Sequence, residues 1–214
     1  MKVLRLPEKI LALIFDLDGT LYTNSLYGRF QESSQVARLA HHLGKSEAEA
    51  QALLDAAREA RRARGLPGTS MANHFLRLGA SMETIIRWRE EAILPKDWLV
   101  PDPRLDSVLA LLGSRFRLAI LTNNPRSVGR ANLEALGVAD RFELVVGLDD
   151  SFESKPSEAP FVAVCSRLGL RPESCVSIGD REEVDLSTPL TLGMGAVLVD
   201  GVEDVYRLPD ILKS

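Results

Sequence analysis

The chain has 214 residues, which suits one large domain or a core of roughly 100 to 150 residues with a smaller insertion. Hydrophobic residues make up 45% and charged residues 26%, which argues against a disordered or fibrous protein. The net charge of -4 gives no general electrostatic reason to bind nucleic acid or an anionic membrane. Since we find neither a signal-type segment nor a run near ~18 apolar residues, we expect a cytoplasmic protein without membrane or nucleic-acid partners.

Five short apolar runs are typical of strands that are buried on both faces of a parallel sheet. They are Ile10–Phe15, Phe116–Leu121, Phe142–Val146, Cys175–Ile178 and Ala196–Val199. Helical patterns that stop at Gly113, Gly137 and Gly169 separate the later runs. Strands that alternate with helices predict an α/β fold, Rossmann-like, with a mainly parallel sheet and right-handed crossovers.

The interval from Asn24 to Pro101 has helical periodicity and no convincing strand. Ser46 and Glu49 form a capping-box pattern that opens one of its helices, and residues 82–94 form another. We therefore expect a small helical domain at residues 24–101, inserted after the first strand. The α/β core would comprise residues 1–23 and 102–214.

Polar residues gather directly after the apolar runs, where the carboxyl ends of strands face the ligand crevice of an open α/β sheet. They are Asp16, Asp18 and Thr20 after the first run, Thr122, Asn123 and Asn124 after the second, and Asp180 and Asp185 after the fourth. Lys155 lies in the loop beyond the third run. Several carboxylates, a hydroxyl and an ammonium along one edge suit a hard cation and a phosphate.

Phosphoryl transfer needs such a set, because an anionic nucleophile must approach an anionic phosphate while positive charge neutralises the transferring oxygens. On an extended segment, Asp16 and Asp18 point to the same side, as the period of two requires. One carboxylate can attack while the other handles protons. Either Asp18-Gly19 or Lys155 alone would be unremarkable, as a turn or a surface lysine, so the joint pattern carries the interpretation.

Four ordered motifs resemble those of the haloacid dehalogenase (HAD) superfamily. The resemblance rests on Asp16-Leu17-Asp18-Gly19-Thr20-Leu21, on Leu121-Thr122-Asn123, on Lys155-Pro156 with Phe161, and on Gly179-Asp180 with Asp185. It covers the core, and it implies that the inserted helices are a cap that closes over a small substrate. The implied enzyme is a magnesium-dependent phosphatase that works through an aspartyl-phosphate.

The resemblance also implies a role for each motif residue. Asp16 would be the nucleophile and a metal ligand, and Asp18 the general acid and then the base, with its carbonyl on Mg²⁺. The phosphoryl oxygens would be held by Thr122 and Asn123, and their charge neutralised by Lys155. Asp180 would complete the metal site, and Asp185 would support it. Arg181 and Val184 depart from the common pattern around Asp180, which weakens the assignment of Asp185 more than that of Asp180.

The substrate stays open between a nucleoside monophosphate, phosphoglycolate and a sugar phosphate. A phosphoglucomutase-like phosphotransferase would use the same residues, and a catalytically silent binding module on the same fold is a further alternative. A dehalogenase would need neither Asp18 nor Asp180. Tyr22 is a candidate for the substrate entrance, and an arginine among Arg58, Arg61, Arg62 and Arg64 could reach the crevice, although a solvated face explains these four better.

Overall fold

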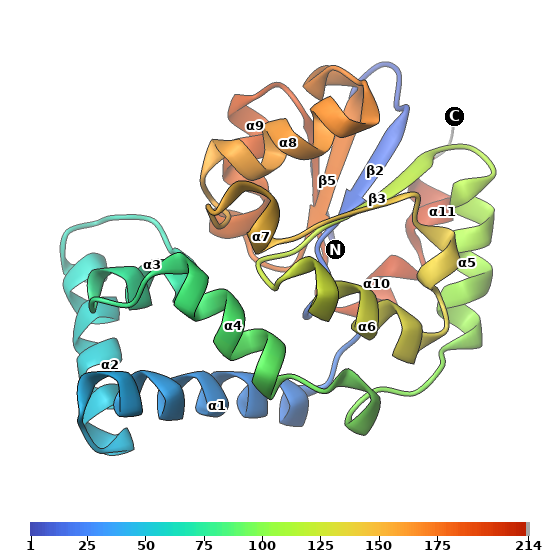
Figure 1. Cartoon of the computed structure of the whole chain (residues 1–214). Coiled ribbons are helices and arrows are strands. Elements are labelled where there is room, and N and C mark those ends of the chain that lie inside the picture. The colour runs from blue at the N-terminus through green and yellow to red at the C-terminus, as the bar shows by residue number, and fades with distance from the viewer. Residues whose placement is uncertain (213–214) are drawn as a thin grey trace.

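The computed structural model describes residues 1–212 and has an α/β core beside a group of helices (Figure 1). The strands are β1 Lys2–Arg5, β2 Ala12–Phe15, β3 Arg117–Leu121, β4 Leu144–Val146, β5 Cys175–Gly179 and β6 Gly195–Leu198. They form one sheet in the order β1-β6-β5-β2-β3-β4. All neighbours pair in parallel except β1, which runs antiparallel to β6. The predicted α/β class and mainly parallel sheet are confirmed, and β2 lies between β3 and β5.

The helices fall into two groups along the chain. Between β2 and β3 lie α1 Ser25–Leu43, α2 Glu47–Ala63, α3 Met71–Arg77 and α4 Met82–Ala92, followed by the short turn η1 Pro95–Asp97. The remaining helices are α5 Pro103–Gly113, α6 Arg126–Leu136, α7 Leu148–Ser151, α8 Glu158–Leu168, α9 Ser187–Thr191, α10 Val202–Val205 and α11 Leu208–Ile211. Three further short turns are η2 Ala139–Arg141, η3 Pro172–Ser174 and the π-helical η4 Glu182–Leu186. Among the described residues, none of the helices has the length and apolar character needed to cross a membrane.

The central strand is buried on both faces because successive side chains point in opposite directions. Leu13 and Phe15 pack into a core cluster with α5 and α6, whereas Ala12 and Ile14 pack against α8 on the other face. This two-sided burial explains the continuous apolar runs. Cys165 and Cys175 are free thiols buried in the second cluster, where they pack as small core residues.

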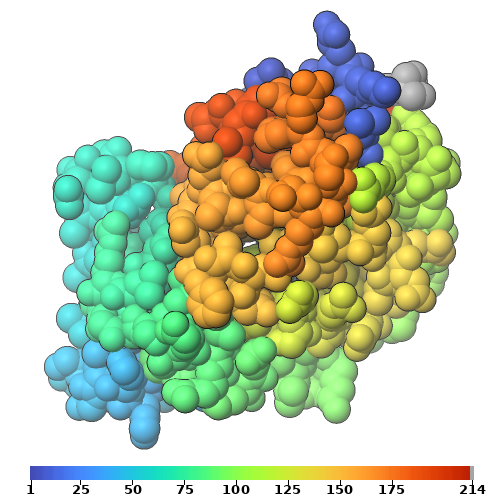
Figure 2. Space-filling view, turned by 45° about the horizontal axis from the view of Figure 1, so that its top comes forward, coloured from blue at the N-terminus to red at the C-terminus, as the bar shows by residue number. Residues whose placement is uncertain are grey.

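The helices α1 to α4, called the cap helices below, pack around a hydrophobic cluster of their own. This cluster includes Leu39, Leu54, Phe75 and Ile85, with Leu148 of the core at its edge. Caps at the helix starts are supplied by Asn24, Ser46, Ser70 and Ser81. The capping box expected of Ser46 and Glu49 is present. In the space-filling view, the cyan and green surface of the cap helices lies against the gold and orange surface of the core (Figure 2).

Two chain crossings connect the cap helices to the core, and they meet at one point. The Asn24 side chain accepts hydrogen bonds from the first turn of α1 and donates one, of 2.9 Å, to the carbonyl of Trp98. The Trp98 ring stacks on Tyr27 and Phe30, at centroid distances of 5.8 and 4.8 Å. The Tyr27 hydroxyl then donates a buried hydrogen bond of 3.1 Å to Asn132 on α6. The beginning of α1 is thus fixed to the core.

Tyr27→Phe is expected to lower the free energy of unfolding by about 1 to 3 kcal/mol, because it leaves the buried Asn132 oxygen without its donor. Urea unfolding followed by circular dichroism measures this as a lower midpoint with an unchanged slope. The matched control is Ser33→Ala on the exposed face of the same helix, which should stay within about 0.5 kcal/mol of the wild type. Equal effects of the two changes would contradict the assigned bond.

Candidate active site

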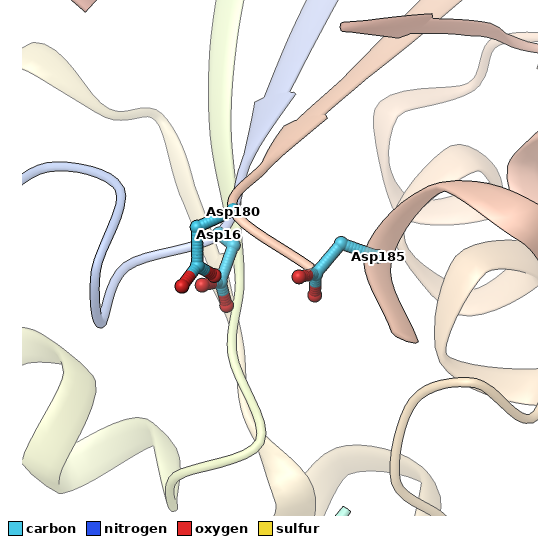
Figure 3. Close-up of side chains that lie close together, drawn as sticks. All are labelled: Asp16, Asp180 and Asp185. Atoms are coloured by element: carbon cyan, nitrogen blue, oxygen red, sulfur yellow. The ribbon is translucent and has the colours of Figure 1, made fainter. Parts of the chain in front are cut away.

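The predicted carboxylates meet at the carboxyl end of the sheet (Figure 3). Asp16 directly follows β2, Asp180 directly follows the neighbouring β5, and Asp185 comes from the turn η4. Each offers a carboxylate oxygen, and these oxygens lie within 4.8 Å of one another. The π-helical turn is an uncommon element that often occurs at functional sites. Here it brings Asp185, four positions after Arg181, back to the backbone N–H of Arg181 at 3.1 Å.

Lys155 is the cation of this cluster and is 1% exposed. Its Nζ lies 2.6 Å from Oδ1 of Asp16 and 2.7 Å from Oδ1 of Asp185. Burial opposes the charged ammonium, but the two carboxylates raise the pKa of Lys155 above its usual value. The lysine is therefore held as a fixed positive charge beside Asp16.

Burial is also the largest influence on the pKa of Asp16 and of Asp180. It raises the pKa of Asp16 to about 7, although the charge of Lys155 acts in the opposite direction. The pKa of Asp180 is raised for the same reason and is held back by Arg181. Two buried carboxylate oxygens, Oδ2 of Asp16 and Oδ1 of Asp180, have no hydrogen-bond partner among the described residues. Such oxygens fit a hard divalent cation.

Gly19 allows the loop after β2 to approach the cluster. Its φ of +82° is left-handed, and a Cβ at this position would lie 2.5 Å from Oδ2 of Asp180. A larger residue would strain the backbone and displace a carboxylate. The glycine that makes Asp18-Gly19 look like an ordinary turn is thus required by the site.

Asp18 is held from three sides by hydrogen-bond donors. Its Oδ1 accepts bonds from the hydroxyl of Tyr22 and, at 2.8 Å, from the amide of Gln31 on α1. Its Oδ2 accepts a bond of 2.9 Å from the amide of Asn124. Tyr22 was expected at the substrate entrance, and it does line the cavity, but its hydroxyl also contacts Asp18 directly.

The second motif makes several contacts within the protein itself. Thr122 is 2% exposed, and its hydroxyl accepts a bond of 3.1 Å from the N–H of Asn124. The Asn123 amide binds the main chain of Lys155, accepting from its N–H at 2.8 Å and donating to its carbonyl at 3.3 Å. Asn123 thereby fixes the loop that carries the lysine. Phosphate binding by Thr122 and Asn123 stays a prediction.

A cavity of about 630 Å³ opens over this cluster, between the core and the cap helices. Its lining joins Asp16, Asp18, Asn123 and Asp180 of the core to residues of α1, α3 and α4, among them Gln31, Gln35, Met71 and Arg89. The arginine-rich end of α2 does not reach the cavity, because its lining among the described residues includes none of Arg58, Arg61, Arg62 and Arg64. Arg58 instead pairs with Glu32 at 2.6 Å.

Arg89 is the cap arginine that sequence reasoning missed. A signal for it exists, because Arg89 follows Ile85 by four positions and Ile86 by three, which places a charged residue on the buried face of α4. A guanidinium on an apolar face has to meet acceptors elsewhere in the fold. It donates to the carbonyl of Asn123 and, at 3.2 Å, to Oδ1 of Asn124.

Comparison with known proteins supports the interpretation of the motifs. The family model of haloacid dehalogenase-like hydrolases matches residues 10–190. A phosphoglycolate phosphatase of Rhodospirillum rubrum is 33% identical over 203 residues, which cover 88% of this chain and 78% of the relative.

Solved structures with the same fold include a HAD phosphatase of Thermococcus onnurineus, at a TM-score of 0.61 and 24% identity, covering 95% of this chain and 98% of that one. YfnB of Bacillus subtilis, solved with magnesium bound, follows at a TM-score of 0.59 and 15% identity, covering 95% and 100%. The family match extends over most of the chain and includes all four motifs. The chain therefore belongs to the haloacid dehalogenase-like hydrolase family, as a phosphoric monoester hydrolase.

Proposed function

We propose that the protein is a magnesium-dependent phosphatase that hydrolyses a small phosphorylated metabolite through an aspartyl-phosphate on Asp16. The observation that carries this proposal is the buried cluster in which Lys155 lies 2.6 Å from Asp16, at the base of a cavity that also contains Asp18 and Asp180. A nucleophile, a fixed cation and a second carboxyl group are the parts that phosphoryl transfer requires.

The residues present fit a divalent cation. Asp16 and Asp180 each contribute a buried oxygen without a partner, and the Asp18 carbonyl is the further ligand that the family resemblance implies. Asp185 would act one step removed, since its oxygens already face Lys155 and the N–H of Arg181. When bound, Mg²⁺ would supply positive charge that keeps the Asp16 carboxylate ionised and neutralises the phosphoryl oxygens.

The protein's own groups divide the chemistry between them. Asp16 attacks phosphorus, and Lys155 holds its carboxylate in position. Asp18 gives a proton to the leaving alcohol and later takes one from the water that attacks the aspartyl-phosphate. Tyr22, Gln31 and Asn124 aim the Asp18 carboxylate into the cavity. The cap helices form one side of the cavity, and their closure over a bound substrate would exclude bulk water from the reacting groups.

The size of the cavity and its enclosure by the cap helices favour a small substrate. Phosphoglycolate, a nucleoside monophosphate and a sugar phosphate are the candidates. Phosphoglycolate comes first, because the Rhodospirillum rubrum relative that matches 88% of the chain is a phosphoglycolate phosphatase. A panel of the three classes, assayed for released phosphate, separates these candidates. Transfer of phosphate back to the substrate, without release, would instead indicate a mutase.

Asp16→Asn should lower the turnover number by at least about 10³-fold, because it removes the nucleophile while nearly preserving the shape of the side chain. Phosphate release from the panel measures the loss, and circular dichroism checks that the variant is folded. Hydrolysis at the wild-type rate would exclude the aspartyl-phosphate mechanism.

Lys155→Met should lower kcat/KM by about 100-fold, corresponding to the ~3 kcal/mol that a single electrostatic group contributes to the transition state. The matched control is Lys45→Met, at an exposed position between α1 and α2, which should retain full activity. Lys155→Met leaves the carboxylates of Asp16 and Asp185 without the cation between them, which can also destabilise the fold. Lys155→Arg keeps the positive charge and is measured beside it to separate the loss of charge from a loss of folding. A loss of tenfold or less in a folded Lys155→Met protein would mean that the lysine is peripheral.

Removal of divalent ions with a chelator should abolish turnover, and added Mg²⁺ should restore it. Asp185→Asn should raise the Mg²⁺ concentration needed for half-maximal activity by about 10- to 100-fold, the range typical of residues that support a metal ligand. Asp180→Asn removes a ligand itself and should raise that concentration at least as much. Titration of both variants with Mg²⁺ gives the two values. Turnover that persists in chelator would overturn the metal dependence.

A further inference from the structure

Arg89 is a buried cation with no carboxylate at ion-pairing distance among the described residues, and the charge of Asp18 acts on it from farther away. It is 7% exposed, and it forms no ion pair with any carboxylate in residues 1–212. Its hydrogen bonds come from Nη1 alone and end on neutral oxygens of Asn123 and Asn124, while its Nε has no acceptor. Burial lowers its pKa to about 10. A guanidinium in this condition is ready to accept an anionic partner.

The other cations of the cavity do not share this condition. Arg181 lies 3.8 Å from both Asp180 and Asp185, so carboxylates of the metal cluster already balance its charge. Arg29 on α1 is exposed to solvent. Arg89 is thus the cation lining the cavity that, among the described residues, is both buried and without an ion pair.

Gln35 adds a second unpartnered group to the same cavity. It is 2% exposed, and neither its amide nitrogen nor its amide oxygen has a hydrogen-bond partner in the described structure. Gln35 lies one helical turn beyond Gln31 on α1, so the two amides share one face of the helix. Gln31 contacts Asp18, which places Gln35 one turn farther from the proton donor.

Both groups line the same cavity as Asp18. The leaving oxygen must be near Asp18, its proton donor. Asn124 joins Asp18 to Arg89, because its amide nitrogen donates to Asp18 at 2.9 Å and its amide oxygen accepts from Arg89 at 3.2 Å. Arg89 is therefore close enough to Asp18 for a short leaving group to span the two. The free edge of a guanidinium, made by Nε and Nη2, matches the two oxygens of a carboxylate.

We propose that Arg89 and Gln35 form a subsite for a carboxylate on the leaving alcohol, so that the enzyme selects phosphate esters of small hydroxy acids. This inference rests on the proposed phosphatase function and narrows its substrate class. Arg89 binds the carboxylate through paired hydrogen bonds, and Gln35 donates to the same group through its amide. The subsite also explains why an arginine lies on the apolar face of α4.

The test compares two esters of similar length, 2-phosphoglycolate and 2-hydroxyethyl phosphate, which differ in having a carboxylate or a hydroxymethyl group at the far end. The wild type should prefer phosphoglycolate by about 10- to 100-fold in kcat/KM, the range expected for hydrogen bonds between charged groups. Arg89→Met should remove most of this preference by acting on phosphoglycolate alone. Gln35→Leu should reduce it less, and Arg87→Met, on the exposed side of the same helix, should leave it intact.

The outcomes separate this inference from the function on which it rests. Equal losses for both esters in Arg89→Met would mean that Arg89 only joins the cap helices to the core, and would overturn the subsite. The subsite would also be overturned by measurements on the wild type alone. These are equal rates for the two esters, or a preference for a bisphosphate of similar length. If the wild type hydrolyses no phosphate ester with Mg²⁺ present, the proposed function fails as well. Arg89→Lys, which keeps the charge but loses the paired geometry, should give an intermediate preference.

Discussion

The contact on which the rest of the site depends is the buried ammonium of Lys155 between the carboxylates of Asp16 and Asp185. Asp16 directly follows β2, Lys155 lies in the loop after α7, and Asp185 lies in the turn η4. One interaction therefore holds three separate segments of the chain together. Burying such a group is favourable only when geometry and hydrogen bonds compensate for lost hydration. Asn123 provides part of that compensation by clamping the main chain of Lys155 at both its N–H and its carbonyl.

A buried cluster of this kind explains why several neighbouring residues have little freedom. Gly19 must be small because Asp180 lies against it, and η4 must take a π-helical form to return Asp185 to the N–H of Arg181. The sheet order suits this cluster, because β2 lies between β3 and β5 and so places Asp16 between Thr122 and Asp180, which directly follow those strands. Fold and chemistry are therefore constrained by the same few contacts.

The core and its carboxylates could be predicted from the sequence because their signals are local. Strands buried on both faces give continuous apolar runs, and the polar residues directly after them must share one edge of the sheet. β1 escaped prediction because Lys2, Val3 and Arg5 are exposed at the sheet margin, and α3 because seven residues are too few to show a period. Gln31, Gln35 and Arg89 acquire their meaning only when the cap helices meet the core, which is a property of docking rather than of any one segment.

The joined crossings at Asn24 and Trp98 limit how the two parts of the molecule can move. The stacked rings of Tyr27, Phe30 and Trp98 reinforce this junction. At a second place, the N–H of Gly68 donates to Glu183 and the hydroxyls of Ser70 and Ser154 lie 2.6 Å apart. The cap helices are thus held to the core at two separate places that both border the cavity, since its lining includes Asn24 and Ser70.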